Sequence, residues 1–184
     1  DFMQHGGDRL VVMAFRGVGK SYIASAFVDW CLLCDPTRLC QVISGPRIRA
    51  DDFSTFTLRL LHEMGDLTAH LLPSEDQRNS KVAFDVGPAP PSHSPSVTSK
   101  GIFSQLTGGR ADLIIPDDIS TKQNSQTQLM RDKIASASEE FNAIIKPDGR
   151  IMYLGTPQSE QDILFDLGNK GYNIRIWPAE VPPA

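Results

Sequence analysis

The chain has 184 residues and a formal net charge of −4, with 40% hydrophobic and 22% charged residues. This composition is typical of a single globular domain, and no apolar run approaches the ~20 residues of a membrane-spanning helix. Dedicated nucleic-acid-binding domains usually carry a basic excess, so any contact with DNA must be local or shared among several copies of the chain.

Short apolar runs alternate with segments of helical periodicity along the chain. The pattern predicts strands at 10–14, 39–44, 81–86, 101–106, 111–116, 151–154 and 172–177, and helices at 19–33, 47–64, 126–145 and 162–167. A long polar loop rich in Pro and Ser is expected at 87–99. Several strands are apolar throughout, which favours an α/β fold with a mostly parallel sheet covered by helices on both faces. Ligands of such sheets bind at the carboxyl ends of the strands.

Three cysteines, Cys31, Cys34 and Cys40, lie close together in the sequence. The odd count favours a reducing compartment. The spacing of Cys31 and Cys34 could form half of a zinc or redox site, but no second cysteine pair follows. We therefore expect buried thiols in a helix and a strand.

The first strand leads into a phosphate-binding loop, Ala14–Ser21. It matches the pattern Gly-x4-Gly-Lys-Ser/Thr between a strand and a helix, except that Ala14 replaces the first glycine. Lys20 is expected to reach the β- and γ-phosphates of ATP, and Ser21 to bind Mg²⁺. The residues expected to surround the nucleotide are Arg16, Gly17, Val18, Gly19, Lys20, Ser21 and Tyr22. This motif predicts a P-loop ATPase rather than a chance glycine-rich turn.

Arg16 is an unusual residue inside such a loop. Its guanidinium could stabilise charge on the γ-phosphate in the transition state. The alternative is an arginine that faces solvent or DNA.

A second acidic motif follows the apolar run 113–116. Asp117 is in the Walker B position, where a carboxylate holds Mg²⁺ directly or through water. Many related ATPases have a catalytic glutamate next, and here Asp118 takes that place as the group that orients the attacking water. Two acidic residues after a strand could instead cap a helix.

Two further positions are candidates for roles in the reaction. Thr156, in the Gly-Thr-Pro turn after the strand at 151–154, could sense the loss of the γ-phosphate, although the same residues suit a plain turn. Arg110 precedes the Walker B strand and could reach the nucleotide of a neighbouring subunit. It could equally form a surface ion pair with Asp112 or Asp117.

The order of these motifs resembles the large terminase subunit of short-tailed bacteriophages. The matching segments, spread over nearly the whole chain, are 14–21, 84–97, 105–112, 113–118 and 153–158. An arginine inside the P-loop and a Gly-Thr-Pro coupling motif are typical of that family. The helicase-like translocases, which share the same ATPase core, are the alternative. A small-molecule kinase would need an acceptor site for which no motif is found, and an assembly module with a purely structural ATP site is a further possibility.

The resemblance implies a motor that packages double-stranded DNA into a procapsid. Such a motor works as a homo-oligomeric ring, usually of five subunits, on the portal protein, together with a small terminase subunit and in the host cytoplasm. It carries an N-terminal ATPase domain and a C-terminal nuclease domain. This chain, 1–184, matches only the ATPase domain, with a helical, lid-like segment at about 125–145, and both of its ends look like cuts in a longer protein.

The resemblance also implies roles for single residues. Thr156 matches the coupling threonine, and Gln4 stands where an upstream glutamine reads adenine. Some relatives place a trans-acting arginine finger at the position of Thr107, which leaves Arg16 as the main candidate in cis and Arg110 as a possible replacement in trans. The loop 87–99 and the pair Arg47 and Arg49 are candidate contacts with DNA or with another subunit, or else ordinary solvated surface.

Overall fold

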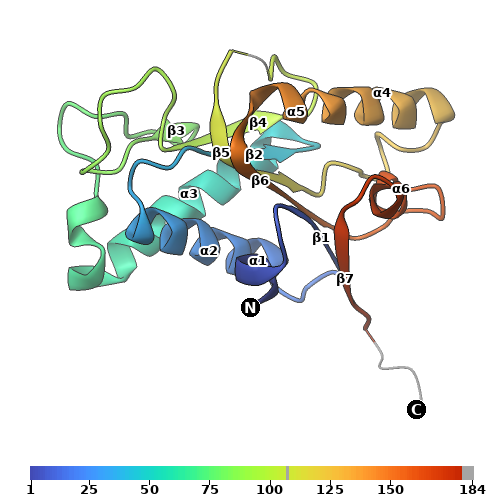
Figure 1. Cartoon of the computed structure of the whole chain (residues 1–184), viewed down its shortest axis with the longest axis horizontal. Helices are drawn as coiled ribbons and strands as arrows, with labels where there is room; N and C mark the ends of the chain where they lie inside the picture. Colours follow the sequence, from blue (N-terminus) through green and yellow to red (C-terminus); the bar gives the residue numbers. More distant parts are fainter. Residues whose placement is uncertain (107, 180–184) are drawn as a thin grey trace.

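A seven-stranded sheet runs through the computed structural model, which describes residues 1–106 and 108–179 (Figure 1). The strand order is β3-β4-β2-β5-β6-β1-β7, and only the β3–β4 pair is antiparallel. The strands are β1 (Arg9–Ala14), β2 (Cys40–Ser44), β3 (Ala83–Phe84), β4 (Val97–Gly101), β5 (Ala111–Asp117), β6 (Ile145–Gly155) and β7 (Asn173–Trp177). The expected mostly parallel sheet of an α/β domain is confirmed.

Helices cover both faces of this sheet. One face carries α1 (Phe2–His5), α2 (Lys20–Cys34) and α3 (Arg47–Glu63), and the other carries α4 (Gln128–Glu139), α5 (Phe141–Ile144) and α6 (Ile163–Asn169) (Figure 1). Two short 3₁₀ helices, Gly65–Leu67 and Ala69–Leu71, follow α3. Along β1, Leu10 and Val12 join the core under α2 and α3, whereas Val11 and Met13 join the core on the opposite face. This alternation follows from the two-residue period of a strand.

No helix within residues 1–106 and 108–179 is both long enough and apolar enough to span a bilayer.

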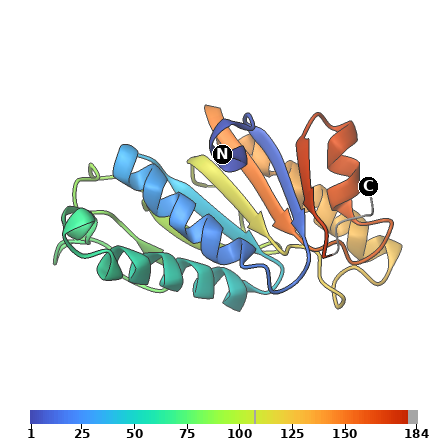
Figure 2. The same cartoon turned by 90° about the horizontal axis from the view of Figure 1, so that it is seen from below.

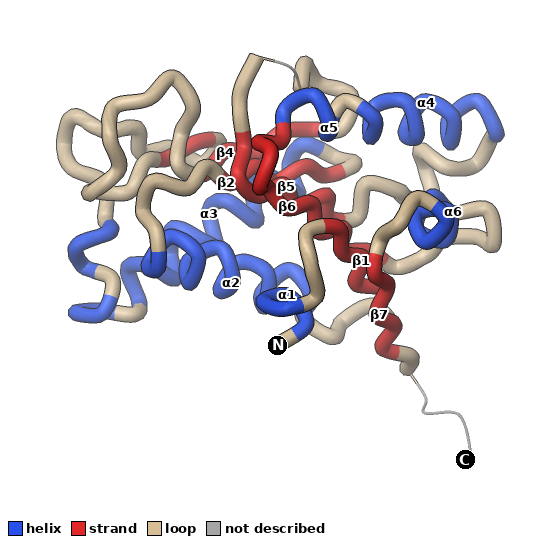
Figure 3. The backbone as a smooth tube through the Cα atoms, in the orientation of Figure 1, coloured by secondary structure: helices blue, strands red, loops and turns tan. Residues whose placement is uncertain are grey.

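The sequence prediction was wrong at the edge of the sheet that holds β3 and β4. A strand was expected at 101–106, but β4 occupies Val97–Gly101 and the polar loop therefore ends before residue 97 (Figure 3). Polar residues hide this strand, because Thr98 and Lys100 alternate with the buried Val97 and Ser99. The chain after β4 forms no strand up to residue 106.

Smaller differences concern the lengths of three elements. β3 is only two residues long, and β6 is longer than expected because it begins at Ile145. The helix predicted at 126–145 divides into α4 and α5 at Glu140. Cys31 and Cys40 are buried as expected, but Cys34 is exposed.

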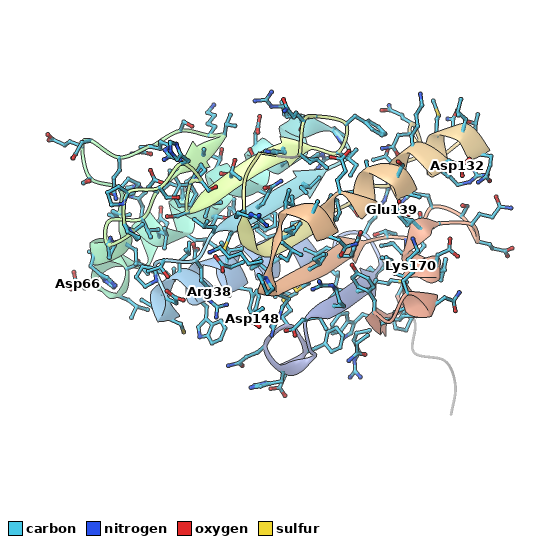
Figure 4. All side chains as sticks on the ribbon, turned by 45° about the horizontal axis from the view of Figure 1, so that its top comes forward. Arg38, Asp66, Asp132, Glu139, Asp148 and Lys170 are labelled. Carbon is cyan, nitrogen blue, oxygen red and sulfur yellow. The ribbon has the colours of Figure 1, made fainter. Side chains whose placement is uncertain are left out.

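Much of α4 faces away from the rest of the molecule. Its buried residues are Ile134 and Ser138, whereas Asp132 and Glu139 lie at the surface (Figure 4). The Thr127 side chain caps the helix by accepting a hydrogen bond from the backbone N–H of Met130. The segment expected to act as a lid is thus a capped helix with a narrow buried stripe.

The order of the central strands brings three separate parts of the chain together at the carboxyl edge of the sheet. β6 lies between β1 and β5, so that Met13 pairs with Gly155 and Asp117 pairs with Leu154. Figure 2 shows these three strands ending at the same edge, where the loop after β1 also lies. The motifs at the ends of β1, β5 and β6 are therefore neighbours in space.

One carboxyl group is buried away from this edge without a partner. Asp29 of α2 is 1% exposed, and neither carboxylate oxygen has a hydrogen-bond partner in the described part of the chain. Burial raises the pKa of Asp29 from 3.8 to about 8. The folded protein therefore keeps Asp29 protonated at neutral pH, because an ionised carboxylate without a partner is costly in an apolar interior.

An Asp29→Asn variant is expected to gain stability relative to the wild type as the pH rises. Between about pH 5 and pH 8 the unfolded chain has released the Asp29 proton while the folded chain retains it, so the wild type loses about 1.4 kcal/mol of unfolding free energy per pH unit. Asparagine does not titrate and escapes this loss. Urea unfolding of both proteins across this pH range measures the difference, and a difference independent of pH would contradict the assignment.

Candidate functional site

The loop between β1 and α2 has the backbone of a phosphate-binding loop. Gly17 and Gly19 adopt φ values of +87° and +84°, a backbone conformation that glycine adopts readily and other residues rarely adopt. Gly19 is the N-cap of α2, so the positive end of a 15-residue helix opens into the loop. Ala14, which replaces the usual first glycine, continues β1 and is buried. The predicted strand–loop–helix context is confirmed.

The ammonium group of Lys20 lies at the centre of the carboxyl edge. It donates to the carbonyl oxygens of Ala14 at 3.1 Å and Phe15 at 3.3 Å, and to Oγ1 of Thr156 at 3.0 Å. The Thr156 hydroxyl in turn donates to the Ala14 carbonyl oxygen at 2.8 Å. The end of β6 and the P-loop are therefore joined through one charged group, and Thr156 is more than a turn residue.

Ser21 and Asp117 form the second contact between motifs. The Ser21 hydroxyl donates to Oδ2 of Asp117 at 2.7 Å, while Oδ1 of Asp117 is buried without a partner in the described residues. Burial raises the pKa of Asp117 to about 6, and the hydrogen bond from Ser21 opposes this rise. A hydroxyl and a buried carboxylate oxygen in need of a partner match the oxygen ligands that Mg²⁺ prefers.

Asp118 has a backbone conformation that fixes the direction of its side chain. Its φ is +45°, the only positive value for a non-glycine residue in the described parts of the chain, and its N–H donates to Leu154 O at 2.9 Å. Oδ1 of Asp118 accepts the backbone N–H of Thr156 at 3.3 Å. The next helix, α4, begins only at Gln128, so neither Asp117 nor Asp118 caps a helix.

A cavity of about 820 Å³ connects these groups. Its volume lies within the range of roughly 300–1,000 Å³ that is usual for small-molecule sites. Its lining includes Arg16, Gly17, Gly19, Lys20, Ser21, Tyr22, Arg49, Phe56, Asp117, Asp118, Lys122 and Gln158. The edge of Tyr22 packs on the ring of Phe56 with centroids 4.7 Å apart, which forms an aromatic wall beside the loop.

Several residues predicted for the site do not line this cavity. Gln4 is exposed on α1, its carbonyl oxygen accepts from Nη1 of Arg150, and it is not part of the cavity lining. Figure 2 shows the N-terminal end of the chain away from the loop after β1. Val18 belongs to the loop but is not part of the lining. The structure does not bring Gln4 to the phosphate-binding loop.

Arg110 lies at the opposite edge of the sheet from the P-loop. It is exposed and immediately precedes β5, whose seven residues separate it from Asp117 by about 20 Å of strand. It lines a separate cavity of about 190 Å³ with Lys100 and His93. A role for Arg110 in the cavity of its own chain is thus excluded by distance, while a role in a neighbouring chain stays a prediction.

The two carboxylates that were candidate ion-pair partners of Arg110 have other hydrogen-bond partners. Asp112 accepts from Lys146 Nζ at 2.8 Å and from the Leu39 N–H at 2.9 Å, and Asp117 accepts from Ser21. Thr107, the position of the arginine finger in some relatives of the family, lies outside the described residues.

Two residues of the cavity lining were not predicted from the sequence to belong to this site. Arg49 was a candidate for DNA contact, yet it lines the cavity and its charge acts on Asp117. Gln158 directly follows the Gly-Thr-Pro turn and accepts a hydrogen bond from Nη2 of Arg16 at 3.3 Å. The position of Gln158 in the matched segment 153–158 was the available signal, but only the fold places it beside Arg16.

Comparison with known proteins supports the resemblance seen in the motifs. The chain is 46% identical over 177 residues to the terminase large subunit of Enterobacteria phage T3. The match covers 95% of this chain and 30% of the phage T3 protein, so the chain spans less than a third of that relative. No family model matches the chain. The sequence thus resembles a terminase large subunit along nearly its whole length.

Solved structures confirm the fold. The N-terminal domain of the DNA packaging ATPase from bacteriophage phi29 aligns with a TM-score of 0.61 and 12% identity, over 96% of this chain and 94% of that one. The large terminase of bacteriophage HK97 aligns with a TM-score of 0.61 and 14% identity, over 98% of this chain and 37% of that one. At these identities the likeness concerns the fold, which is that of the P-loop ATPase domains of such proteins.

A Thr156→Val variant is expected to lose about 1 kcal/mol of unfolding free energy. Valine keeps the shape of the side chain but removes the hydroxyl that accepts from Lys20 and donates to Ala14. Thr156→Ser retains the hydroxyl and serves as the matched control. Urea unfolding measures the change, and equal stability of all three proteins would show that the hydroxyl does not join the two strand ends.

Proposed function

We propose that this chain is the ATPase domain of a terminase motor, which hydrolyses ATP to translocate double-stranded DNA into a viral procapsid. One observation carries the proposal: the ends of β1 and β5 bring Lys20, the Ser21–Asp117 pair and Asp118 into a single cavity. Thr156, at the end of β6, is hydrogen-bonded to Lys20 and to Asp118 of this lining. The 46% identity to a terminase large subunit supports a role of this ATPase site in DNA packaging.

Phosphate binding uses the loop and the charge beside it. Backbone N–H groups of the loop and the N-terminus of α2 hold the phosphate oxygens, and Lys20 binds the β- and γ-phosphates. Ser21 and Asp117 would hold Mg²⁺, because Oδ1 of Asp117 is a buried oxygen that otherwise has no partner in the described residues. A Mg²⁺ ion at this place would supply positive charge beside the phosphates.

Hydrolysis requires a water in line with the bond that breaks. Asp118 orients this water and accepts its proton, while the water oxygen bonds to the γ-phosphorus and the bond to the ADP oxygen breaks. The Thr156 N–H holds one oxygen of Asp118, which leaves the other oxygen for the water. Asp118 is one methylene shorter than the usual glutamate. Its positive φ turns the backbone after β5, so that its side chain leaves in a different direction from that of a residue in a regular strand.

The charge that develops on the phosphate is stabilised by Lys20 and, in cis, by Arg16. Arg110 adds charge in trans, from a neighbouring copy of the chain. Thr156 contacts both Lys20, which binds the phosphate, and Asp118, which orients the water, and therefore responds when the γ-phosphate is lost.

The partners that we propose are those implied by the resemblance to the terminase family. They are double-stranded DNA, the portal protein, a small terminase subunit and further copies of the chain in a ring of five. The motor would act in the host cytoplasm and transiently on the procapsid. The polar loop before β4 and Arg47 are the candidate DNA contacts. A helicase-like translocase is the alternative function, and a strand-separation assay distinguishes it because a packaging motor moves intact duplex.

Lys20→Ala and Asp118→Asn are each expected to lower the rate of ATP hydrolysis by at least about 100-fold. Lys20→Ala removes a cation that binds the transferred phosphate, and Asp118→Asn removes the base while keeping the shape of the side chain. Phosphate release under steady-state conditions measures both effects. Lys133→Ala, which removes an exposed lysine of α4 that does not line the cavity, is the matched control for charge. Unchanged rates in both variants would contradict an ATPase function.

Hydrolysis is expected to depend on the concentration of the chain if Arg110 acts in trans. The specific activity should rise with protein concentration, and Arg110→Ala should abolish this rise while leaving the rate of the dilute protein unchanged. Rate measurements over a hundredfold range of concentration, about 0.1 to 10 µM, test this. A specific activity independent of concentration, together with a harmless Arg110→Ala change, would remove Arg110 from the mechanism.

A further inference from the structure

Gln158 makes three hydrogen bonds at the wall of the cavity, two through its side chain and one through its backbone. Its Oε1 accepts from Nη2 of Arg16 at 3.3 Å, and its Nε2 donates to the carbonyl oxygen of Thr156 at 2.6 Å. Its backbone N–H donates to Oδ2 of Asp162 at 3.0 Å. Both ends of the amide are therefore engaged, so that Oε1 stays at a fixed place beside the P-loop.

Arg16 depends on this fixed acceptor for its orientation. The side chain is exposed and precedes Gly17, whose φ of +87° marks a sharp turn of the backbone. Gln158 is the only hydrogen-bond partner of the Arg16 guanidinium in residues 1–106 and 108–179. A long exposed side chain loses conformational entropy when it is ordered, so a partner that orders it beforehand favours its later contact with a phosphate.

Asp162 extends the contact to a helix. It is 2% exposed, and its second oxygen, Oδ1, accepts the N–H of Leu164 at 3.2 Å as the N-cap of α6. The helix packs directly against the end of β6, because a Cβ at Gly155 would lie 2.6 Å from Cδ1 of Leu164. Gln158, Asp162 and the start of α6 thus share hydrogen bonds at the point where β6 ends.

We propose that Gln158 is a positioning residue, which orients Arg16 toward the phosphates and links Arg16 to α6 through Asp162. The inference rests on the proposed ATPase function and adds two statements to it. Arg16 acts only when Gln158 orders it, and the direct hydrogen-bonded route out of the cavity leads to α6. The segment at 125–145 has no comparable chain of hydrogen bonds to Arg16 in the described structure.

A double-mutant cycle tests the link between Gln158 and Arg16. Gln158→Ala should lower kcat about tenfold with a smaller change in KM for ATP, because the loss affects charge stabilisation in the transition state more than binding. In an Arg16→Ala background the same change should lower kcat less than about twofold, since two residues that act as a unit are not additive. Gln161→Ala, a glutamine truncated three residues further along the same loop and exposed, is the matched control and should leave kcat unchanged.

Two outcomes of the cycle would overturn this link. An equal fold-loss from Gln158→Ala with and without Arg16 would show that Gln158 acts on the reaction independently of the arginine. A rise in KM with no change in kcat would place Gln158 in simple nucleotide binding and would also overturn the positioning role.

Amide hydrogen exchange tests the link to α6 without any hydrolysis. Adding a non-hydrolysable ATP analogue with Mg²⁺ to the wild-type chain should alter exchange in both the first turn of α2 and in α6. In Gln158→Ala the response of α2 should persist, and the response of α6 should fall at least about twofold.

The two proposals fail in different ways in this experiment. A wild-type chain that shows no response in α2 does not bind the nucleotide, which would overturn the proposed function and this inference with it. A normal α2 response together with an α6 response that is the same in wild type and Gln158→Ala would overturn the inference alone.

Discussion

The ammonium group of Lys20 is the interaction on which the arrangement of the site depends. It bridges the P-loop carbonyls and the hydroxyl of Thr156, and so joins β1 to β6 at the carboxyl edge of the sheet. A phosphate bound to Lys20 would compete with these acceptors, because the ammonium group has only three N–H donors and all three already have partners. Binding of a phosphate and relaxation of the β1–β6 contact are therefore coupled through one atom.

The insertion of β6 between β1 and β5 extends this contact from Lys20 to Asp118. With β6 in that place, Thr156 can contact Lys20 from its side chain and Asp118 from its backbone N–H. The same residue is thus in contact with the group that we propose binds the phosphate and with the carboxylate that we propose orients the water. A sheet in which β1 and β5 were direct neighbours would keep the Ser21–Asp117 contact but would leave no place for such a residue.

Local sequence was sufficient for the parts of the site that are contiguous in the chain. The apolar run 10–14, the spacing of Gly19, Lys20 and Ser21, and the acidic end of β5 each follow from short-range rules. The partnership of Gln158 with Arg16 could not be predicted, because it joins residues 142 positions apart and depends on the strand order. β4 was misplaced because its polar residues alternate with buried ones in a strand of only five residues. The location of Arg110, by contrast, was implicit in the sequence, since a residue that precedes a strand lies at the amino edge of a parallel sheet.

The separation of Arg16 and Arg110 on opposite edges of the sheet has a consequence for assembly. An arginine at the amino edge of one copy can serve only the carboxyl edge of another copy, so the two surfaces in contact differ. Contacts of this head-to-tail kind produce a closed ring when the rotation between copies closes, and a filament when it does not. In a ring every cavity receives one arginine from a neighbour in addition to its own Arg16, and the two charges differ in what controls them. Under the proposed mechanism, Arg16 is ordered within its own chain by Gln158, whereas Arg110 would arrive only through the contact between copies. Hydrolysis in one copy would then depend on the position of the next.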